Sequence, residues 1–104
     1  MFEINGVWWQ VVDVSPQDNI LRRPDGALTV GACDNITKTI YLSSALFGLF
    51  KKKVLCHEVT HAAMFSYDVT LTEEQEELIA ELIATFGDEI VSITNALFYG
   101  IRRR

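Results

Sequence analysis

The sequence has few of the residues that usually build metal and disulfide sites, with two cysteines and two histidines among 104 residues. Cys33 and Cys56 are too far apart for a zinc ribbon, in which cysteine ligands come in closely spaced pairs. In a reducing compartment we expect both to be packed thiols. A role of the Cys56 thiol as a metal ligand is the alternative, although on a helix Cys56 lies on a different face from His61.

Long apolar runs and an excess of basic charge are also absent. No apolar run reaches the ~18 residues that a membrane span needs. The first residues, MFEINGVWW, lack the basic and then apolar regions of a secretory signal. The net charge of −5 argues against broad nucleic-acid binding. We therefore expect a cytoplasmic protein that binds neither membranes nor nucleic acid.

The length and composition of the chain suit one globular domain covering residues 1–104, because 49% of the residues are hydrophobic and 11% are aromatic. The Asn5-Gly6 pair predicts a hairpin whose second strand runs over residues 7–14. Residues 27–33 and 37–43 read as two further strands joined by a turn. We expect a small antiparallel sheet of three or four strands.

Residues 15–26 are rich in side chains that favour turns, namely Pro16, Asp18, Asn19, Pro24, Asp25 and Gly26. We therefore expect a loop here. It is the best candidate for a mobile flap beside a substrate site, and a plain connector is the alternative.

Helices are predicted for the second half of the chain. The first begins near Ala45, capped by Ser43 or Ser44, and runs to about Tyr67, with Gly48 as a candidate break. Its buried surface is expected from apolar side chains at Val54, Leu55, Val59, Ala62, Ala63 and Phe65.

A second helix starts at a capping box formed by Thr72 and Gln75, and acidic residues fill its first turn. The pattern continues past Gly87, which predicts either one long helix with an irregularity there or two helices. The apolar stripe of this helix consists of Leu78, Ile79, Leu82, Ile83 and Phe86. The expected fold class is α+β, with the sheet packed on the first helix and on a long glutamate-bearing C-terminal helix.

The segment His57-Glu58-Val59-Thr60-His61 contains both histidines of the chain in an HExxH arrangement. On a helix His57 and His61 stand one turn apart on one face, where both can bind one zinc ion. Glu58 points away from that pair and can act as a base without being a ligand. Solvated or core-bonded histidines are the alternative. Zinc also needs a third protein ligand, for which a glutamate of the acidic second helix is the economical choice.

Residues 28–90 also resemble the small zinc-peptidase-like proteins of the ImmA/IrrE type, found in bacteria and phages. The resemblance runs through GACDNITKTIYLS, VLCHEVTHAAMFSY and EEQEELIAELIATFG. It implies a minimal zincin-like fold of the gluzincin kind, and it makes Glu77 the third zinc ligand through the segment ELIA. Glu81 would then hydrogen-bond a ligand histidine, and it is also the runner-up ligand. The other glutamates of this helix, Glu73, Glu74 and Glu76, are expected to be solvated.

The activity implied is zinc-dependent hydrolysis of a peptide bond, with Glu58 as general base and a protein, such as a repressor or other regulatory protein, as substrate. Tyr41, Tyr67 and Tyr99 are candidate donors to the oxyanion, and packed aromatic side chains are the alternative for each. The peptide is expected to pair with the edge strand ending near Ser43, or to be presented by a partner protein.

Two alternatives to an enzyme remain: an interaction module that keeps zinc for stability, and a metal-free phage protein acting on a host factor. Two basic clusters, Lys51–Lys53 and Arg102–Arg104, are expected to be solvated. The lysines could contact an acidic partner, and the arginines could give weak phosphate contacts.

Overall fold

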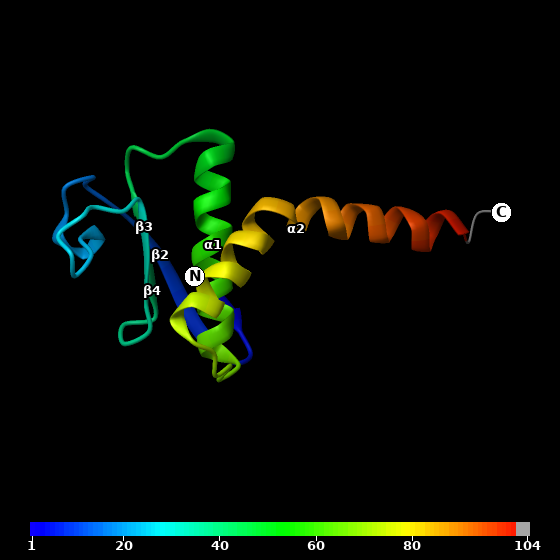
Figure 1. Cartoon of the computed structure of the whole chain (residues 1–104), viewed down its shortest axis with the longest axis horizontal. Helices are drawn as coiled ribbons and strands as arrows, with labels where there is room; N and C mark the ends of the chain where they lie inside the picture. Colours follow the sequence, from blue (N-terminus) through cyan, green and yellow to red (C-terminus); the bar gives the residue numbers. More distant parts are fainter. Residues whose placement is uncertain (102–104) are drawn as a thin grey trace.

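The computed structural model describes residues 1–101 and combines a small sheet with two helices (Figure 1). The α+β class expected from the sequence is confirmed. The arginine cluster at residues 102–104 lies outside the described residues. The elements are β1 (Phe2–Ile4), β2 (Val7–Val14), the short 3-10 helix η1 (Asn19–Leu21), β3 (Gly31–Asp34), β4 (Thr39–Ser43), α1 (Gly48–Ser66) and α2 (Glu73–Ile101).

The sheet is mixed, with the strand order β1-β2-β4-β3. The pairs β1–β2 and β3–β4 are antiparallel, whereas β2 and β4 are parallel. The prediction of an antiparallel sheet was therefore wrong for its central pair. The reason is the connection over residues 15–30, which carries the chain from the end of β2 to the far edge at β3, so that β4 returns beside β2 in the same direction.

Both predicted turns are confirmed. Asn5 and Gly6 have φ angles of 49° and 78°, the left-handed values that a two-residue hairpin between right-twisted strands requires. Between β3 and β4 the Asp34 carboxylate accepts hydrogen bonds from the backbone N–H groups of Ile36 and Thr37 at 2.8 and 3.4 Å. Local side-chain chemistry thus determines where each hairpin reverses.

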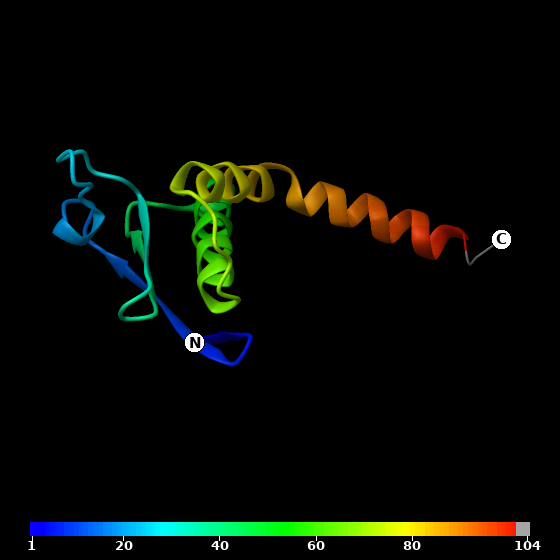
Figure 2. The same ribbon diagram turned by 60° about the horizontal axis from the view of Figure 1, so that its bottom comes forward.

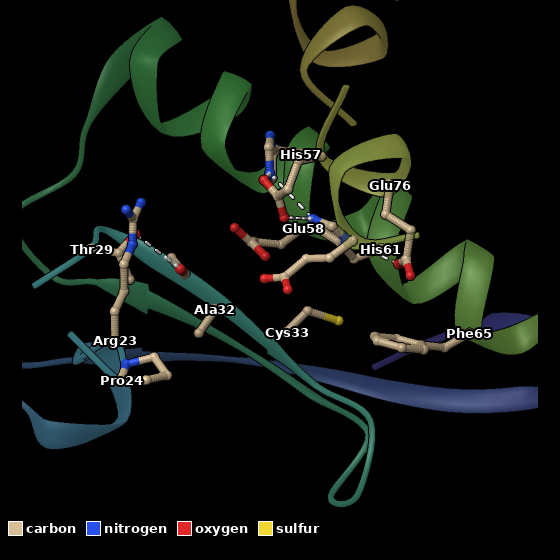
Figure 3. Close-up of a pocket in the computed structure, with 13 residues that line it drawn as sticks. Arg23, Pro24, Thr29, Ala32, Cys33, His57, Glu58, His61, Phe65 and Glu76 are labelled. Carbon is tan, nitrogen blue, oxygen red and sulfur yellow. Dashed lines mark hydrogen bonds and ion pairs between the residues drawn. The ribbon is translucent and has the colours of Figure 1, made fainter. Parts of the chain in front are cut away.

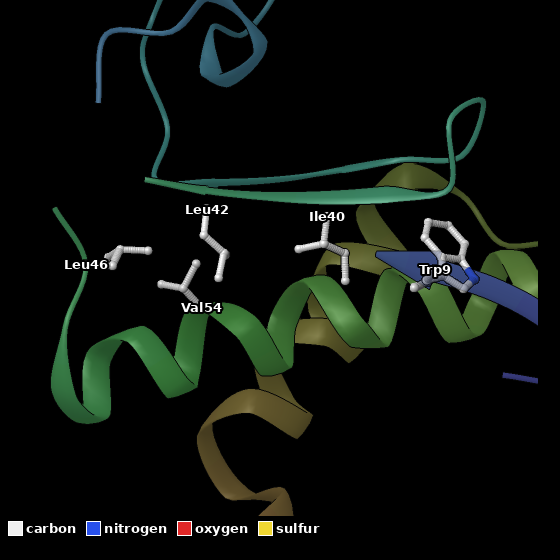
Figure 4. Packing of buried hydrophobic residues seen from close by; sticks show 6 residues of the cluster. Trp9, Ile40, Leu42, Leu46 and Val54 are labelled. Atoms are coloured by element: carbon white, nitrogen blue, oxygen red, sulfur yellow. The ribbon is translucent and has the colours of Figure 1, made fainter. Parts of the chain in front are cut away.

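Helix α1 covers one face of the sheet (Figure 2). The core between them is made by Trp9, Ile40, Leu42, Leu46, Val54 and Ala62, all buried (Figure 4). Leu55, Val59 and Phe65 pack at its margin, and Ala63 is half-buried. Apart from Ala63, the predicted apolar surface of α1 therefore packs in the core against the sheet as expected.

The start of α1 differs from the prediction. The helix begins at Gly48, and neither Ser43 nor Ser44 caps it, because Ser43 is the last residue of β4. The Ser43 hydroxyl instead accepts a hydrogen bond from the Ala45 N–H at 3.2 Å, within the turn that leaves the strand. Gly48 has a φ of 63°, which is not compatible with a position inside a right-handed helix, so the boundary falls there.

Helix α2 begins as predicted, because Thr72 N–H donates to Gln75 Oε1 at 3.0 Å and Gln75 N–H donates to Thr72 Oγ1 at 3.2 Å. It continues through Gly87 as one helix and leaves the rest of the molecule (Figure 1). The expected packing of the sheet on this helix was wrong, because α2 packs chiefly on α1. Its apolar stripe is largely exposed, since Ile79 is half-buried while Leu78, Leu82, Ile83 and Phe86 are 39–69% exposed. No helix within residues 1–101 is long and apolar enough to span a bilayer.

The end of α1 is held to the sheet by a buried polar contact. The indole N–H of Trp9, which is fully buried, donates to the Ser66 hydroxyl at 2.8 Å. The same hydroxyl donates to the Ala62 carbonyl at 2.7 Å, so all polar atoms of this buried group are paired.

We predict that Ser66→Ala lowers the free energy of unfolding by about 1–3 kcal/mol, because it leaves the buried Trp9 N–H without an acceptor. Urea denaturation followed by tryptophan fluorescence measures the change. Ser92→Ala, at an exposed position of α2, is the matched control and should stay near wild type. Equal stability of the two variants would show that the Trp9 contact does not contribute.

Candidate metal centre

The site forms where the first turns of α2 cross α1. His57 and His61 stand one turn apart on α1, and their Nε2 atoms lie 3.3 Å from each other. Glu77 of α2 faces both rings, with one oxygen 3.1 Å from His57 Nε2 and the other 2.8 Å from His61 Nε2. The three residues predicted as metal ligands are thus brought together from two helices.

These distances can be compared with those around a zinc ion. Ligand atoms of tetrahedral zinc, each about 2.0–2.1 Å from the ion, lie about 3.3–3.4 Å apart. The observed separations of 2.8 to 3.3 Å are close to these values, and the donors are two imidazoles and a carboxylate. Within residues 1–101, His57, His61 and Glu77 are the one group of three potential ligands clustered in this way. The residues therefore fit zinc.

Each histidine has a second glutamate behind it. Glu81 Oε2 lies 3.5 Å from His57 Nδ1, the place expected for it from the sequence, and it is not part of the ligand group. Glu76 Oε1 lies 3.5 Å from His61 Nδ1. The expectation that Glu76 is solvated was wrong, because α2 turns it toward α1 and leaves its side chain only 21% exposed. Carboxylates at Nδ1 orient imidazole rings, and here the Nε2 atoms of both rings face Glu77.

The lysine cluster at the start of α1 pairs with acids of the chain itself. Lys53 contacts Glu81 at 3.1 Å, Lys52 contacts Asp88 at 2.6 Å and Lys51 contacts Asp13 at 3.7 Å. The hydrogen bond and charge of Lys53 lower the pKa of Glu81, so that its carboxylate is ionised beside His57. Two of these pairs, Lys52–Asp88 and Lys53–Glu81, join α1 to α2, and the second lies beside His57.

Glu58 lies in the same place but outside the ligand group, and its side chain is buried between α1 and β3 (Figure 3). The pKa of Glu58 is raised from an ordinary 4.5 to about 7. Burial is the main cause; the neighbouring charge of His57 acts against it, and the charge of Glu77 adds to it. A carboxylate with such a pKa is a suitable general base near neutral pH.

Gly31 provides the room for Glu58, a role that sequence reasoning missed. A Cβ atom at this position would lie 2.8 Å from Val54 Cγ1 and 3.1 Å from Glu58 Oε2. These are closer than normal contacts, so only glycine allows β3 to pass this near to α1. The one signal in the sequence is a glycine inside a predicted strand, which often marks a close approach.

A cleft of about 540 Å³ opens over the site. It is lined by Arg23, Pro24 and Thr29 of the long connection, Gly31, Ala32 and Cys33 of β3, His57, Glu58, His61 and Phe65 of α1, and Glu73, Glu76 and Glu77 of α2 (Figure 3). The connection thus lies beside the site, as expected of a flap, although its mobility stays a prediction. Arg23 was not among the residues predicted from the sequence.

Other predicted participants are not brought to the cleft. None of Tyr41, Tyr67 and Tyr99 lines it, so the structure does not bring the candidate oxyanion donors to the cleft. Cys56 lines a separate hollow between α1 and α2, away from the metal group. Cys33 does line the cleft, where burial and then the charge of Glu58 raise the pKa of its thiol to about 12, but it is not part of the clustered group of three potential ligands.

The chain matches no protein-family model, no curated protein and no solved structure. The likeness to ImmA/IrrE-type proteins therefore stays an expectation from the residues of the sequence. Function has to be inferred from the geometry of the cleft and its side chains.

We predict that Glu77→Ala loses most of the zinc affinity, as His57→Ala and His61→Ala do, because each removes a donor that no other residue replaces. Glu81→Ala should weaken zinc binding roughly 10- to 100-fold, because it only orients His57. Competition with a chromophoric zinc chelator measures both constants. If Glu81→Ala empties the site and Glu77→Ala does not, the ligand is Glu81.

Proposed function

We propose that the protein is a zinc-dependent metallopeptidase in which Glu58 is the general base. One observation carries the proposal: a buried carboxylate with a raised pKa lines the same cleft as a group of three side chains that could hold a metal ion, without belonging to that group. A purely structural zinc site needs no such residue and usually has four protein ligands, whereas a catalytic one has three.

His57, His61 and Glu77 would hold the zinc ion, which would supply a Lewis acid for the scissile carbonyl and for the attacking water. Glu58 accepts the proton of the attacking water and then transfers it to the amine that leaves. Its burial against β3 keeps the carboxylate in one place, and Gly31 leaves the space that it needs. Glu76 and Glu81 hold the two imidazole rings in position.

The peptide substrate binds along β3. This strand is the edge of the sheet and lines the cleft with Gly31, Ala32 and Cys33, so an extended peptide can pair with its outer side directly below the metal group. The edge that was expected from the sequence, ending near Ser43, was wrong, because β4 lies between β2 and β3. A protein segment able to become extended is therefore the proposed class of substrate.

In the alternative, a non-enzymatic interaction protein, the same ligands would hold zinc only to stabilise the fold. It requires a fourth protein donor at the metal or no role for Glu58. Within residues 1–101 the clustered group stops at three residues, which favours the enzyme.

We predict that Glu58→Gln keeps zinc bound while peptidase activity falls by several orders of magnitude, because the amide preserves the shape and cannot accept the proton. Zinc content and the cleavage rate of an unstructured protein substrate such as casein are measured together. Glu74→Gln, at an exposed position of α2 outside the cleft, is the control. Undiminished cleavage by Glu58→Gln would assign the base elsewhere.

A further inference from the structure

Arg23 is a cation in the cleft that the proposed chemistry does not use. It belongs to the connection between β2 and β3 and lines the cleft beside the metal group. None of the ion pairs formed among residues 1–101 includes its guanidinium. Its neighbour Arg22, by contrast, is engaged within the connection, donating to the Gly26 carbonyl at 2.8 Å.

The guanidinium of Arg23 forms no ion pair although several carboxylates line the same cleft. Four carboxylates line the same cleft, on Glu58, Glu73, Glu76 and Glu77, and Arg23 is the one lysine or arginine among the lining residues. It also lines the adjoining hollow of about 360 Å³, again beside His57 and Glu58. A guanidinium binds carboxylates through a planar pair of N–H donors, and Arg23 is a lining residue of the cleft whose guanidinium forms no ion pair within residues 1–101.

The cleft has two chemically different ends. Arg23 and Pro24 lie at one end and Phe65 at the other, with His57, Glu58 and His61 between them (Figure 3). Strand β3 runs from the Arg23 end toward the Phe65 end, since Ala32 lies nearer the former and Cys33 nearer the latter. A peptide paired antiparallel to β3 therefore runs from Phe65 to Arg23.

We infer that Arg23 selects substrates with a carboxylate on the C-terminal side of the scissile bond, while Phe65 contacts an apolar residue on the N-terminal side. This rests on the proposed peptidase function and names its substrate class. The carboxylate is either that of an Asp or Glu side chain or the terminal carboxylate of the peptide, because the guanidinium binds both in the same way.

The test uses the zinc-loaded full chain and a library of randomised peptides, with cleavage sites identified by mass spectrometry. Wild type should favour acidic residues on the C-terminal side over their amides by about tenfold, the factor of one charge-assisted contact. Arg23→Ala should abolish this preference, and Arg23→Glu should favour Lys or Arg instead. Lys52→Ala is the control: it also removes one positive charge, but at the ion pair with Asp88 outside the cleft, so it should keep the wild-type preference.

Two peptide pairs identify the source of the carboxylate. Loss of cleavage on Asp→Asn replacement assigns a side chain, and loss on amidation of the C-terminus assigns the terminal carboxylate. Cleavage by wild type without preference for either would overturn the inference and leave the peptidase proposal intact.

If the wild-type zinc protein cleaves no peptide, the proposed function fails and binding decides the role of Arg23. Zinc-loaded Glu58→Gln is then titrated into fluorescein-labelled versions of the same pairs, followed by anisotropy. A carboxylate site is supported if Glu58→Gln binds the acidic peptides more tightly than their amides and the double variant Glu58→Gln/Arg23→Ala binds both equally. Equal binding of acid and amide, or no binding, contradicts it.

Discussion

The crossing of α1 by the first turns of α2 is the contact on which the site depends. Two histidines on one helix give zinc two ligands, and the third must come from another element. Ala80 is completely buried at this crossing, and its small side chain lets the helices approach closely. Glu77, almost one turn earlier, then reaches both imidazoles. The pairs Lys53–Glu81 and Lys52–Asp88 extend the same contact.

The glutamates near this crossing have different environments although they share one chemistry. Glu58 is buried and its pKa is raised, which suits a base, whereas Lys53 lowers the pKa of Glu81 beside a histidine. Glu77 is more than half exposed and faces the Nε2 atoms of both rings. Position relative to α1 and β3, more than residue type, therefore gives the three glutamates different environments.

Much of the site could be predicted from the sequence because its information is local. The i, i+4 spacing of His57 and His61 determines their shared face, and the capping box at Thr72 sets the start of α2. The places of Glu77 and Glu81 followed from the likeness to a known family and agree with the geometry. Their roles toward a metal stay predictions.

The remaining features depend on contacts between distant segments, which no local pattern encodes. The parallel pairing of β2 with β4 results from the path of residues 15–30, and the same path brings Arg23 to the cleft. The position of Glu76 against His61 depends on the rotation of α2 about its axis. Gly31 is informative only once β3 is known to pass Glu58.

The central claim is a zinc site with three protein ligands on α1 and α2 and one position left for substrate or solvent. A crystal structure of the zinc-loaded protein, with anomalous data at the zinc edge, tests it most directly. The account predicts one zinc peak bound by His57 Nε2, His61 Nε2 and a Glu77 oxygen, with Glu58 nearby but not coordinating. A fourth ligand from the chain, or zinc bound away from the two histidines, would contradict it.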